Sequence, residues 1–244
     1  MNAVQTVNLT KRFKDKAAVN DLNLSIKQGE LFALLGVNGA GKTTTIKMLS
    51  CLTAPTSGDA VLLGDSIVSH SHAVKQKINV SPQETAVAAN LSVKENLELI
   101  AEIYGSNQKK AKQRADEMLA AFQLTEVTKH KAKTLSGGMQ RRLSIAMALI
   151  SNPQILFLDE PTLGLDVLAR RELWTEIEKL KGKITIILTT HYLEEAEALS
   201  DHIGIMAQGK LVAVGTAAEL ISSTKSNSFE DAFIALASES KVQG

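Results

Sequence analysis

The sequence has a single cysteine, Cys51, and no apolar run that approaches the roughly 20 residues a membrane-spanning helix requires. One cysteine cannot form an intramolecular disulfide, which suits a reducing compartment. The amino-terminal residues lack the basic start and apolar core of a secretory signal. If the protein acts at a membrane, we therefore expect another polypeptide to cross the bilayer.

The chain also lacks an excess of either charge. Lys and Arg number 27, Asp and Glu number 26, and the net charge is +1 at pH 7. This balance gives the protein no overall positive potential that would attract nucleic acid or an anionic membrane. We therefore expect no nucleic-acid partner. Hydrophobic residues make up 44% and charged residues 22% of the 244, as in ordinary globular proteins. This length suits one large domain with room for an inserted subdomain.

Hydrophobic patterning predicts an α/β fold. Short strands are expected at 4–9, 22–26, 31–35, 78–80, 155–158 and 184–188, with a hairpin at 203–206 and 210–214. Helices are expected at 43–52, 139–150, 172–180 and 229–236. Strands that alternate with helices favour a mixed, mostly parallel sheet with helices on both faces, preceded here by an antiparallel β part.

Residues 91–133 change to helical spacing, which indicates a helical insertion. Its cluster of Lys109, Lys110, Lys112 and Arg114 fits a solvated face better than a surface for an acidic partner. We predict one main domain over residues 1–222, with a helical subdomain at about 84–152. Residues 223–244 would form a short linker and an amphipathic helix.

A glycine-rich loop of the form G-x-x-x-x-G-K-[ST] stands between a predicted strand and a predicted helix. The glycines let successive backbone N–H groups face phosphate oxygens, and the helix adds its positive end. Lys42 would bridge the β- and γ-phosphates, and the Thr43 hydroxyl would coordinate Mg²⁺. The expected nucleotide contacts are Gly36, Val37, Asn38, Gly39, Ala40, Gly41, Lys42, Thr43 and Thr44. A GTPase is disfavoured, because the chain has no Asn-Lys-x-Asp segment.

Two carboxylates, Asp159 and Glu160, end an apolar strand, at the sheet edge where open α/β folds bind ligands. Asp159 would hold Mg²⁺, and Glu160 would act as the general base toward the attacking water. The alternative is a strand end with ordinary surface acids. His191 follows another predicted strand; such a histidine is often structural, and the neighbouring motifs are what favour function. His70, His72, His130 and His202 have no such context and are interpreted as surface or packing residues.

With these segments in order, the chain closely resembles the ATP-binding subunits of ABC transporters over nearly its full length. The matching segments are Gln83, the signature Leu135 to Gln140, Asp159-Glu160, the aspartate loop Gly164-Leu165-Asp166, and His191. The resemblance implies two subunits packed head to tail, with each ATP between one glycine loop and the partner's signature. Ser136, Gly137, Gly138 and Gln140 would belong to that signature, and Asp166 would order the opposite site.

The resemblance also implies that Gln83 contacts the γ-phosphate and Mg²⁺, and that Phe13 stacks on adenine, although Phe13 could equally pack at a sheet edge. Val37 replaces the proline common in the loop, yet no catalytic group is missing. The segments around Thr189-Thr190-His191, Val214-Gly215-Thr216 and 228–233 are similar to bacterial type-2 exporters of drugs, antibiotics and sodium.

These features predict an ATPase subunit, peripheral on the cytoplasmic face of the cell membrane, that drives export through a separate permease as a homodimer or heterodimer. An intracellular helix of the permease could dock at about 84–110. Two alternatives stay open: a soluble ABC ATPase, for example of the iron–sulfur assembly type, and a regulatory module without turnover. Intact Glu160 and His191 argue against the second alternative.

Overall fold

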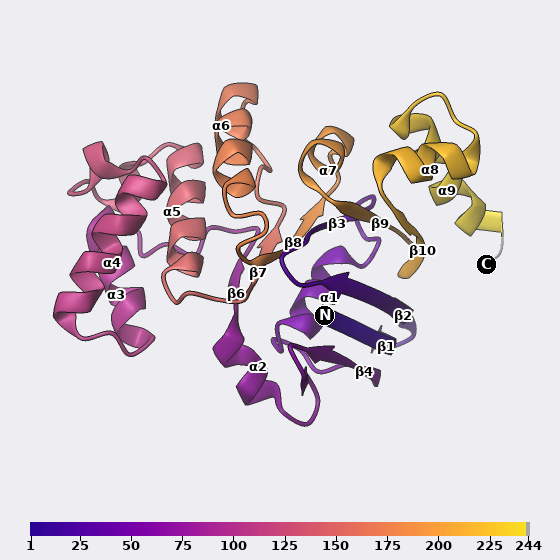
Figure 1. The fold of residues 1–244 in the computed structure, drawn as a ribbon, viewed down its shortest axis with the longest axis horizontal. Helices are drawn as coiled ribbons and strands as arrows, with labels where there is room; N and C mark the ends of the chain where they lie inside the picture. Colours follow the sequence, from indigo (N-terminus) through magenta and orange to yellow (C-terminus); the bar gives the residue numbers. More distant parts are fainter. Residues whose placement is uncertain (243–244) are drawn as a thin grey trace.

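The computed structural model describes residues 1–242, which contain two β-sheets (Figure 1). The larger sheet has the strand order β10-β9-β3-β8-β7-β6 and the smaller one β2-β1-β4-β5. The strands are β1 (Asn2–Phe13), β2 (Lys16–Lys27), β3 (Leu31–Leu35), β4 (Ser57–Leu62), β5 (Asp65–Ser66), β6 (Ile78–Ser81), β7 (Ile155–Asp159), β8 (Thr185–Thr190), β9 (His202–Ala207) and β10 (Lys210–Gly215).

The larger sheet is parallel from β9 to β6, and β10 alone runs antiparallel to its neighbour. Every residue of β3, β7 and β8 is buried, because helices or the smaller sheet cover both faces. These strands are therefore continuous apolar runs in the sequence, and the predicted mixed, mostly parallel architecture is confirmed. The carboxyl ends of β3, β7 and β8 meet at one edge of the sheet.

Two hydrophobic clusters cover the opposite faces of the larger sheet. One joins it to the antiparallel sheet through α1 (Lys42–Leu49), which buries Ile46, Met48 and Leu49. The other cluster packs β3, β7 and β8 against helices that lie after residue 92 of the chain. The hairpin of β1 and β2 turns between Phe13 and Lys16.

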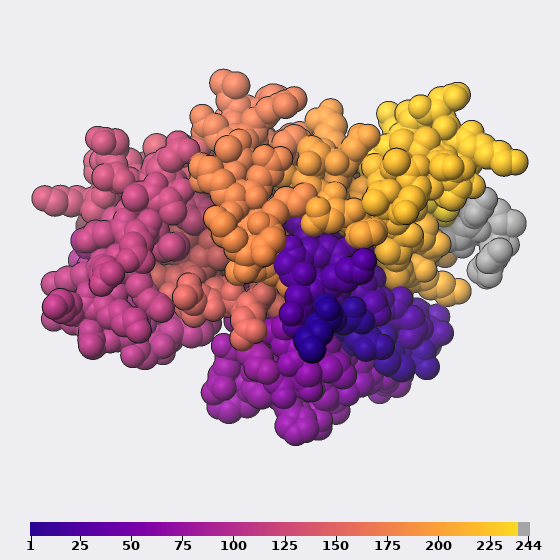
Figure 2. Space-filling model, viewed as in Figure 1, coloured from indigo at the N-terminus to yellow at the C-terminus, as the bar shows by residue number. Residues whose placement is uncertain are grey.

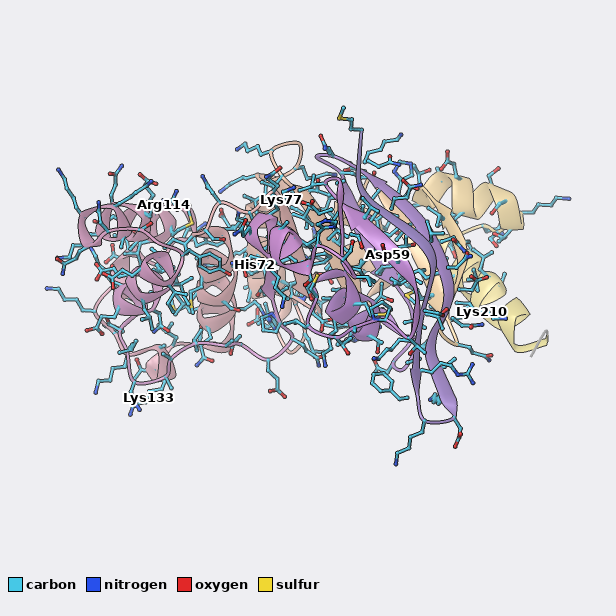
Figure 3. All side chains as sticks on the ribbon, turned by 90° about the horizontal axis from the view of Figure 1, so that it is seen from below. Asp59, His72, Lys77, Arg114, Lys133 and Lys210 are labelled. Carbon is cyan, nitrogen blue, oxygen red and sulfur yellow. The ribbon has the colours of Figure 1, made fainter. Side chains whose placement is uncertain are left out.

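The predicted helical insertion contains α3 (Val93–Ile103), α4 (Gln108–Ala121) and α5 (Gly137–Leu149), with short 3-10 turns at Thr125–Val127 and Ala132–Thr134. It forms a lobe at one end of the molecule (magenta in Figure 2). A capping box between Ser92 and Glu95 starts α3. The predicted solvated face of α4 is exposed at its three lysines, whereas Arg114 donates to the carbonyl of Ile150 at 2.9 Å. Figure 3 shows Arg114 and Lys133 in this lobe.

Other elements differ from the sequence-based expectation. Helix α6 (Val167–Glu178) begins well before the predicted residue 172, because the Asp166 carboxylate caps its first turn. Helices α2 (Ser71–Lys77), α7 (Leu193–Leu199) and α8 (Ala217–Thr224) were not predicted, nor were β4 and β5. Helix α9 (Phe229–Val242) includes the predicted amphipathic segment, and Phe229 is buried. Within residues 1–242, no helix combines the length and apolar character needed to span a membrane.

Candidate active site

The glycine loop connects β3 to α1 and is shaped by close backbone contacts. Gly41, which precedes α1, has φ +107°, and a Cβ there would lie 2.5 Å from the carbonyl oxygen of Ala18. A Cβ on Gly36 would lie 2.5 Å from the carbonyl oxygen of Met206. No side chain caps α1, and its first turn has no acidic residue. Its amino-terminal N–H groups are therefore available to an anion such as phosphate.

Lys42 is buried and held by the loop and by one carboxylate. Its Nζ donates to the carbonyl of Gly36 at 2.6 Å and lies 3.2 Å from Glu160 Oε1. His191 Nδ1 lies 2.7 Å from Glu160 Oε2. Glu160 thus bridges Lys42 and His191, and its backbone has the strained value φ +50°. Both oxygens of the predicted general base are engaged in this arrangement.

Asp159 lies beside the start of α1. Its Oδ1 accepts hydrogen bonds from the Thr43 hydroxyl at 3.1 Å and from the Thr189 hydroxyl at 2.6 Å. A carboxylate and a hydroxyl on adjacent elements supply the oxygen donors that Mg²⁺ prefers. The donor set of Thr43 and Asp159 therefore fits the predicted cation.

A cavity of about 540 Å³ opens over these groups, within the range of small-molecule sites. Its walls come from the β1–β2 hairpin, the glycine loop, the β6–α3 connection, and the segments that follow β7 and β8. The lining residues are Phe13, Lys16, Ala18, Asn38, Gly39, Ala40, Gly41, Lys42, Thr43, Thr44, Gln83, Glu160, Leu163 and His191. Most of the residues predicted for one chain's half of the site therefore lie together around this cavity. Asp159 does not line the cavity but contacts Thr43, which does.

Phe13 forms part of the cavity wall and is 54% exposed, so it is not packed at a sheet edge. Lys11 Nζ lies 5.2 Å from the centre of its ring. Lys16 lines the same wall but belongs to none of the sequence motifs, so it was not predicted. The exposed ring leaves apolar surface available for a flat ligand.

The signature and the aspartate loop lie outside this cavity. Ser136 caps α5 by accepting from the N–H of Met139 at 3.3 Å, and Gln140 donates to the carbonyls of Ala132 and Leu135. A Cβ on Gly138 would lie 3.3 Å from Cβ of Ala169 in the first turn of α6. Asp166 accepts from the N–H groups of Leu168 and Ala169, each at 3.0 Å. Gly36 and Val37 also do not line the cavity.

Two buried charged residues near the site were missed by the sequence reasoning. Arg141, in α5, donates to the carbonyls of Pro82 and Gln83, which ties the root of the Gln83 loop to the signature helix. Burial lowers the pKa of Arg141, and the charges of Asp159 and Glu195 oppose that shift. Glu195, in α7, is completely buried and accepts from the indole N–H of Trp174 at 3.0 Å. Arg141 directly follows the signature and Glu195 lies four residues after His191, but no role was assigned to either residue from the sequence.

The profile of the family described as "ABC transporter" matches residues 19–163. The chain belongs to the ABC transporter family. A relative from Bacillus subtilis, described as a linearmycin resistance ATP-binding protein, is 42% identical over 90% of this chain and 71% of its own length. A daunorubicin resistance ATP-binding protein of Streptomyces coeruleorubidus is 41% identical over 88% of this chain and 68% of its own length.

Solved structures agree with this ABC transporter assignment. An ATP-binding subunit of an ABC transporter superposes with a TM-score of 0.85 at 27% identity, covering 96% of this chain and 99% of that one. A dimeric ATP-binding cassette in a post-hydrolysis state, bound to ADP and phosphate, gives a TM-score of 0.79 at 28% identity, covering 87% and 98%. This ABC transporter protein is therefore an ATP-binding and ATP-hydrolysing subunit, as the sequence predicted.

Proposed function

We propose that this chain powers export through a separate permease by binding two ATP molecules between two head-to-tail ATPase subunits. The observation that carries the proposal is the division of the site. The cavity of one chain contains the groups suited to phosphate, cation and base chemistry, whereas its signature lies elsewhere on its surface. A two-fold pair would complete both sites at once.

In this proposal ATP enters the 540 Å³ cavity with its base against the exposed ring of Phe13 and its phosphates over the glycine loop. Lys42 would bind the β- and γ-phosphates, and the N–H groups at the start of α1 would add to the cradle. Mg²⁺ would be held by Thr43, Asp159 and Gln83, and when bound it would neutralise phosphate charge. The adjacency of Thr43 and Asp159 supports this assignment.

Hydrolysis would require Glu160 to leave Lys42. The γ-phosphate would replace the Glu160 carboxylate as the partner of Lys42, since both anions compete for the same buried ammonium group. Glu160 would then accept a proton from the attacking water, and His191 would hold Glu160 and the γ-phosphate in place. The 2.7 Å contact between His191 and Glu160 supports this pairing.

The partner subunit would supply Ser136, Gly137, Gly138 and Gln140. Ser136 and the N–H groups that open α5 suit an anion, and Gly137 has open space around it. Beside the capping Asp166, the side chains of Val167 and Leu168 are 65% and 76% exposed. Apolar side chains at this exposure on the first turn of a helix favour burial against a second subunit.

The permease would dock on a groove beside the Gln83 loop. A cavity of about 140 Å³ there is lined by Asn79, Val80, Pro82, Ala86, Ile100, Tyr104, Ser144, Met147 and Ala148. Ile103 and Tyr104, at the end of α3, are 67% and 50% exposed. A short groove with apolar rims suits the apolar face of a partner helix. Docking would place this chain on the inner face of the cell membrane.

The cargo would belong to the class of drugs and antibiotics, by likeness to the two resistance proteins. The cassette does not itself select the cargo, since a human phospholipid-transporting ATPase, ABCA3, is also 42% identical over 83% of this chain and 12% of its own length. Selection would therefore reside in the permease.

Co-purification from membranes tests the proposal. The tagged chain should retain a polytopic protein that stimulates ATP hydrolysis, and Ile103→Glu should abolish retention because it places a charge on the groove's rim. Val68→Glu, at a residue that is 59% exposed away from the groove, serves as the matched control. Retention of soluble partners alone, with hydrolysis intact, would instead support an ATPase outside transport.

A further inference from the structure

A buried carboxyl group, Glu195, lies behind the site and has no part in the proposed chemistry. It belongs to α7, the helix that follows His191, and its exposed fraction is 0%. Burying a carboxyl group costs free energy unless hydrogen bonds compensate. The contacts of Glu195 therefore indicate what the group does.

The carboxyl group joins three segments. Glu195 Oε1 accepts from Trp174 Nε1 of α6 at 3.0 Å, and the helix α6 begins at the Asp166 cap. The hydroxyls of Thr162 and Thr190 lie beside the same carboxyl group. Thr162 follows Glu160 closely, and Thr190 directly precedes His191. Each segment that meets Glu195 therefore carries a residue of the proposed site.

A second contact links the same two elements. The guanidinium of Arg170, one turn before Trp174 on α6, lies 4.5 Å from the centre of the Tyr192 ring. The Tyr192 ring lies 4.1 Å from the His191 ring. The segment around His191 is thus joined to α6 on both sides of the α7 start, through Tyr192 and through Glu195.

The electrostatic surroundings favour the neutral form of this carboxyl group. Burial raises the pKa of Glu195 and the charge of Glu160 adds to the shift, whereas the nearby hydroxyls of Thr190 and Thr162 and the indole N–H of Trp174 oppose it. Within the described residues, Glu195 Oε2 and Thr162 Oγ1 are buried and have no hydrogen-bond partner.

We propose that Glu195 is a positioning residue that holds the His191 segment against the helix beginning at Asp166. Through this contact, His191 takes its place over the γ-phosphate when the aspartate loop is set by the partner subunit. The inference rests on the proposed role of His191 in hydrolysis. It assigns to Glu195 and Trp174 the link between the aspartate loop and the histidine of the same chain.

Steady-state ATP hydrolysis, equilibrium ATP binding and thermal unfolding of four variants and one control variant test the link. Glu195→Ala should lower kcat by roughly 10- to 100-fold with KM and ATP affinity changed less than about twofold, because it misplaces His191 and removes no ligand contact. Glu195→Gln retains an acceptor for Trp174 and should stay within about threefold of the wild type. Trp174→Phe should also lower kcat. The double variant Glu195→Ala/Trp174→Phe should have a kcat no lower than that of Glu195→Ala alone, because both substitutions break the same contact. The exposed Glu197→Ala, on the same helix, is the matched control.

The proposal would be overturned if Glu195→Gln lost as much activity as Glu195→Ala. It would also be overturned if the effects of the Glu195 and Trp174 substitutions on kcat were additive. A lower Tm with unchanged kcat would make Glu195 structural only and would also overturn it. If Glu195→Ala does not fold, Trp174→Phe, which keeps most of the ring volume, bears the same expectation. The variant His191→Ala separates failure of the proposed function from failure of this inference. If His191→Ala keeps full ATPase activity, the proposed role of His191 is refuted. If His191→Ala loses activity while Glu195→Ala keeps it, only this inference is refuted.

Discussion

Replacement of Glu160 by glutamine is the sharpest perturbation of the proposed chemistry. Glu160 is 6% exposed, with Oε1 3.2 Å from Lys42 Nζ and Oε2 2.7 Å from His191 Nδ1. Glutamine has the same shape, and its carbonyl oxygen can accept one of these hydrogen bonds. It cannot take the proton of the attacking water. The change therefore removes the base and the anion while leaving the cavity wall in place.

The expected magnitude follows from the role of a positioned base. General-base catalysis contributes about 10²- to 10⁴-fold, which is about 2.7 to 5.4 kcal/mol of the activation barrier. We expect kcat to fall by that factor. Lys42 loses its anionic competitor, so ATP should bind as tightly as in the wild type or up to roughly tenfold more tightly. The gain stays well below the Coulomb energy of the pair, because desolvation opposes it.

Hydrolysis under saturating Mg·ATP and equilibrium binding of ATP to the same preparation provide the assay. Glu178→Gln, an exposed position on α6, is the matched control and should leave both quantities unchanged. A Glu160→Gln enzyme that keeps kcat within threefold of the wild type would refute Glu160 as the base. Loss of ATP binding would refute the competition between Glu160 and the γ-phosphate for Lys42.

Three further outcomes are expected. Thr43→Ala should weaken ATP binding only when Mg²⁺ is present, as titration with and without a chelator would reveal; equal weakening in both conditions would contradict a metal role. Phe13→Ala should weaken ATP binding by about 0.5–1.5 kcal/mol, or roughly two- to twelvefold, with kcat unchanged, and Phe13→Trp should restore it. Because burial raises the pKa of Glu195, the folded chain keeps a proton over a pH range in which the unfolded chain has lost it, so this group's contribution to stability declines as pH rises through that range. Glu195→Gln should remove that decline in urea unfolding measured from pH 5 to 8, and an unchanged slope would contradict it.

Elements with a strong local pattern were predictable from the sequence. The strand expected at 31–35 is β3, and those expected at 155–158 and 184–188 end within two residues of the ends of β7 and β8, because a fully buried parallel strand is a mostly apolar run. Helices α2, α7 and α8 are short and partly exposed, so their apolar residues show too few turns to reveal a period. Helix α6 starts earlier than predicted because the Asp166 side chain caps it. From the sequence alone, Asp166 is assigned only a functional role.

The part of the site made by local motifs was predictable for the same reason. The glycine loop and the strand ends place their side chains at one edge of the parallel sheet, whatever the rest of the chain does. Arg141 and Glu195 depend on contacts between distant segments: Arg141 reaches a carbonyl 59 residues away, and Trp174 lies 21 residues before Glu195. A buried charge in the middle of a helix has no local signature, since its partners come from other elements.

The arrangement of Lys42, Glu160 and His191 explains why a single subunit should hydrolyse slowly. In one chain Glu160, the proposed general base, is paired with Lys42, the residue proposed to bind phosphate, so the two groups satisfy each other. ATP can break this pairing, but the signature that would bind the γ-phosphate from the other side is absent from the same cavity. In the proposed mechanism, ATP binding would free Glu160 and dimerisation would complete the site, so both steps would be needed for hydrolysis. The proposal therefore ties hydrolysis to the dimer, the state in which ATP binding would do work on a permease.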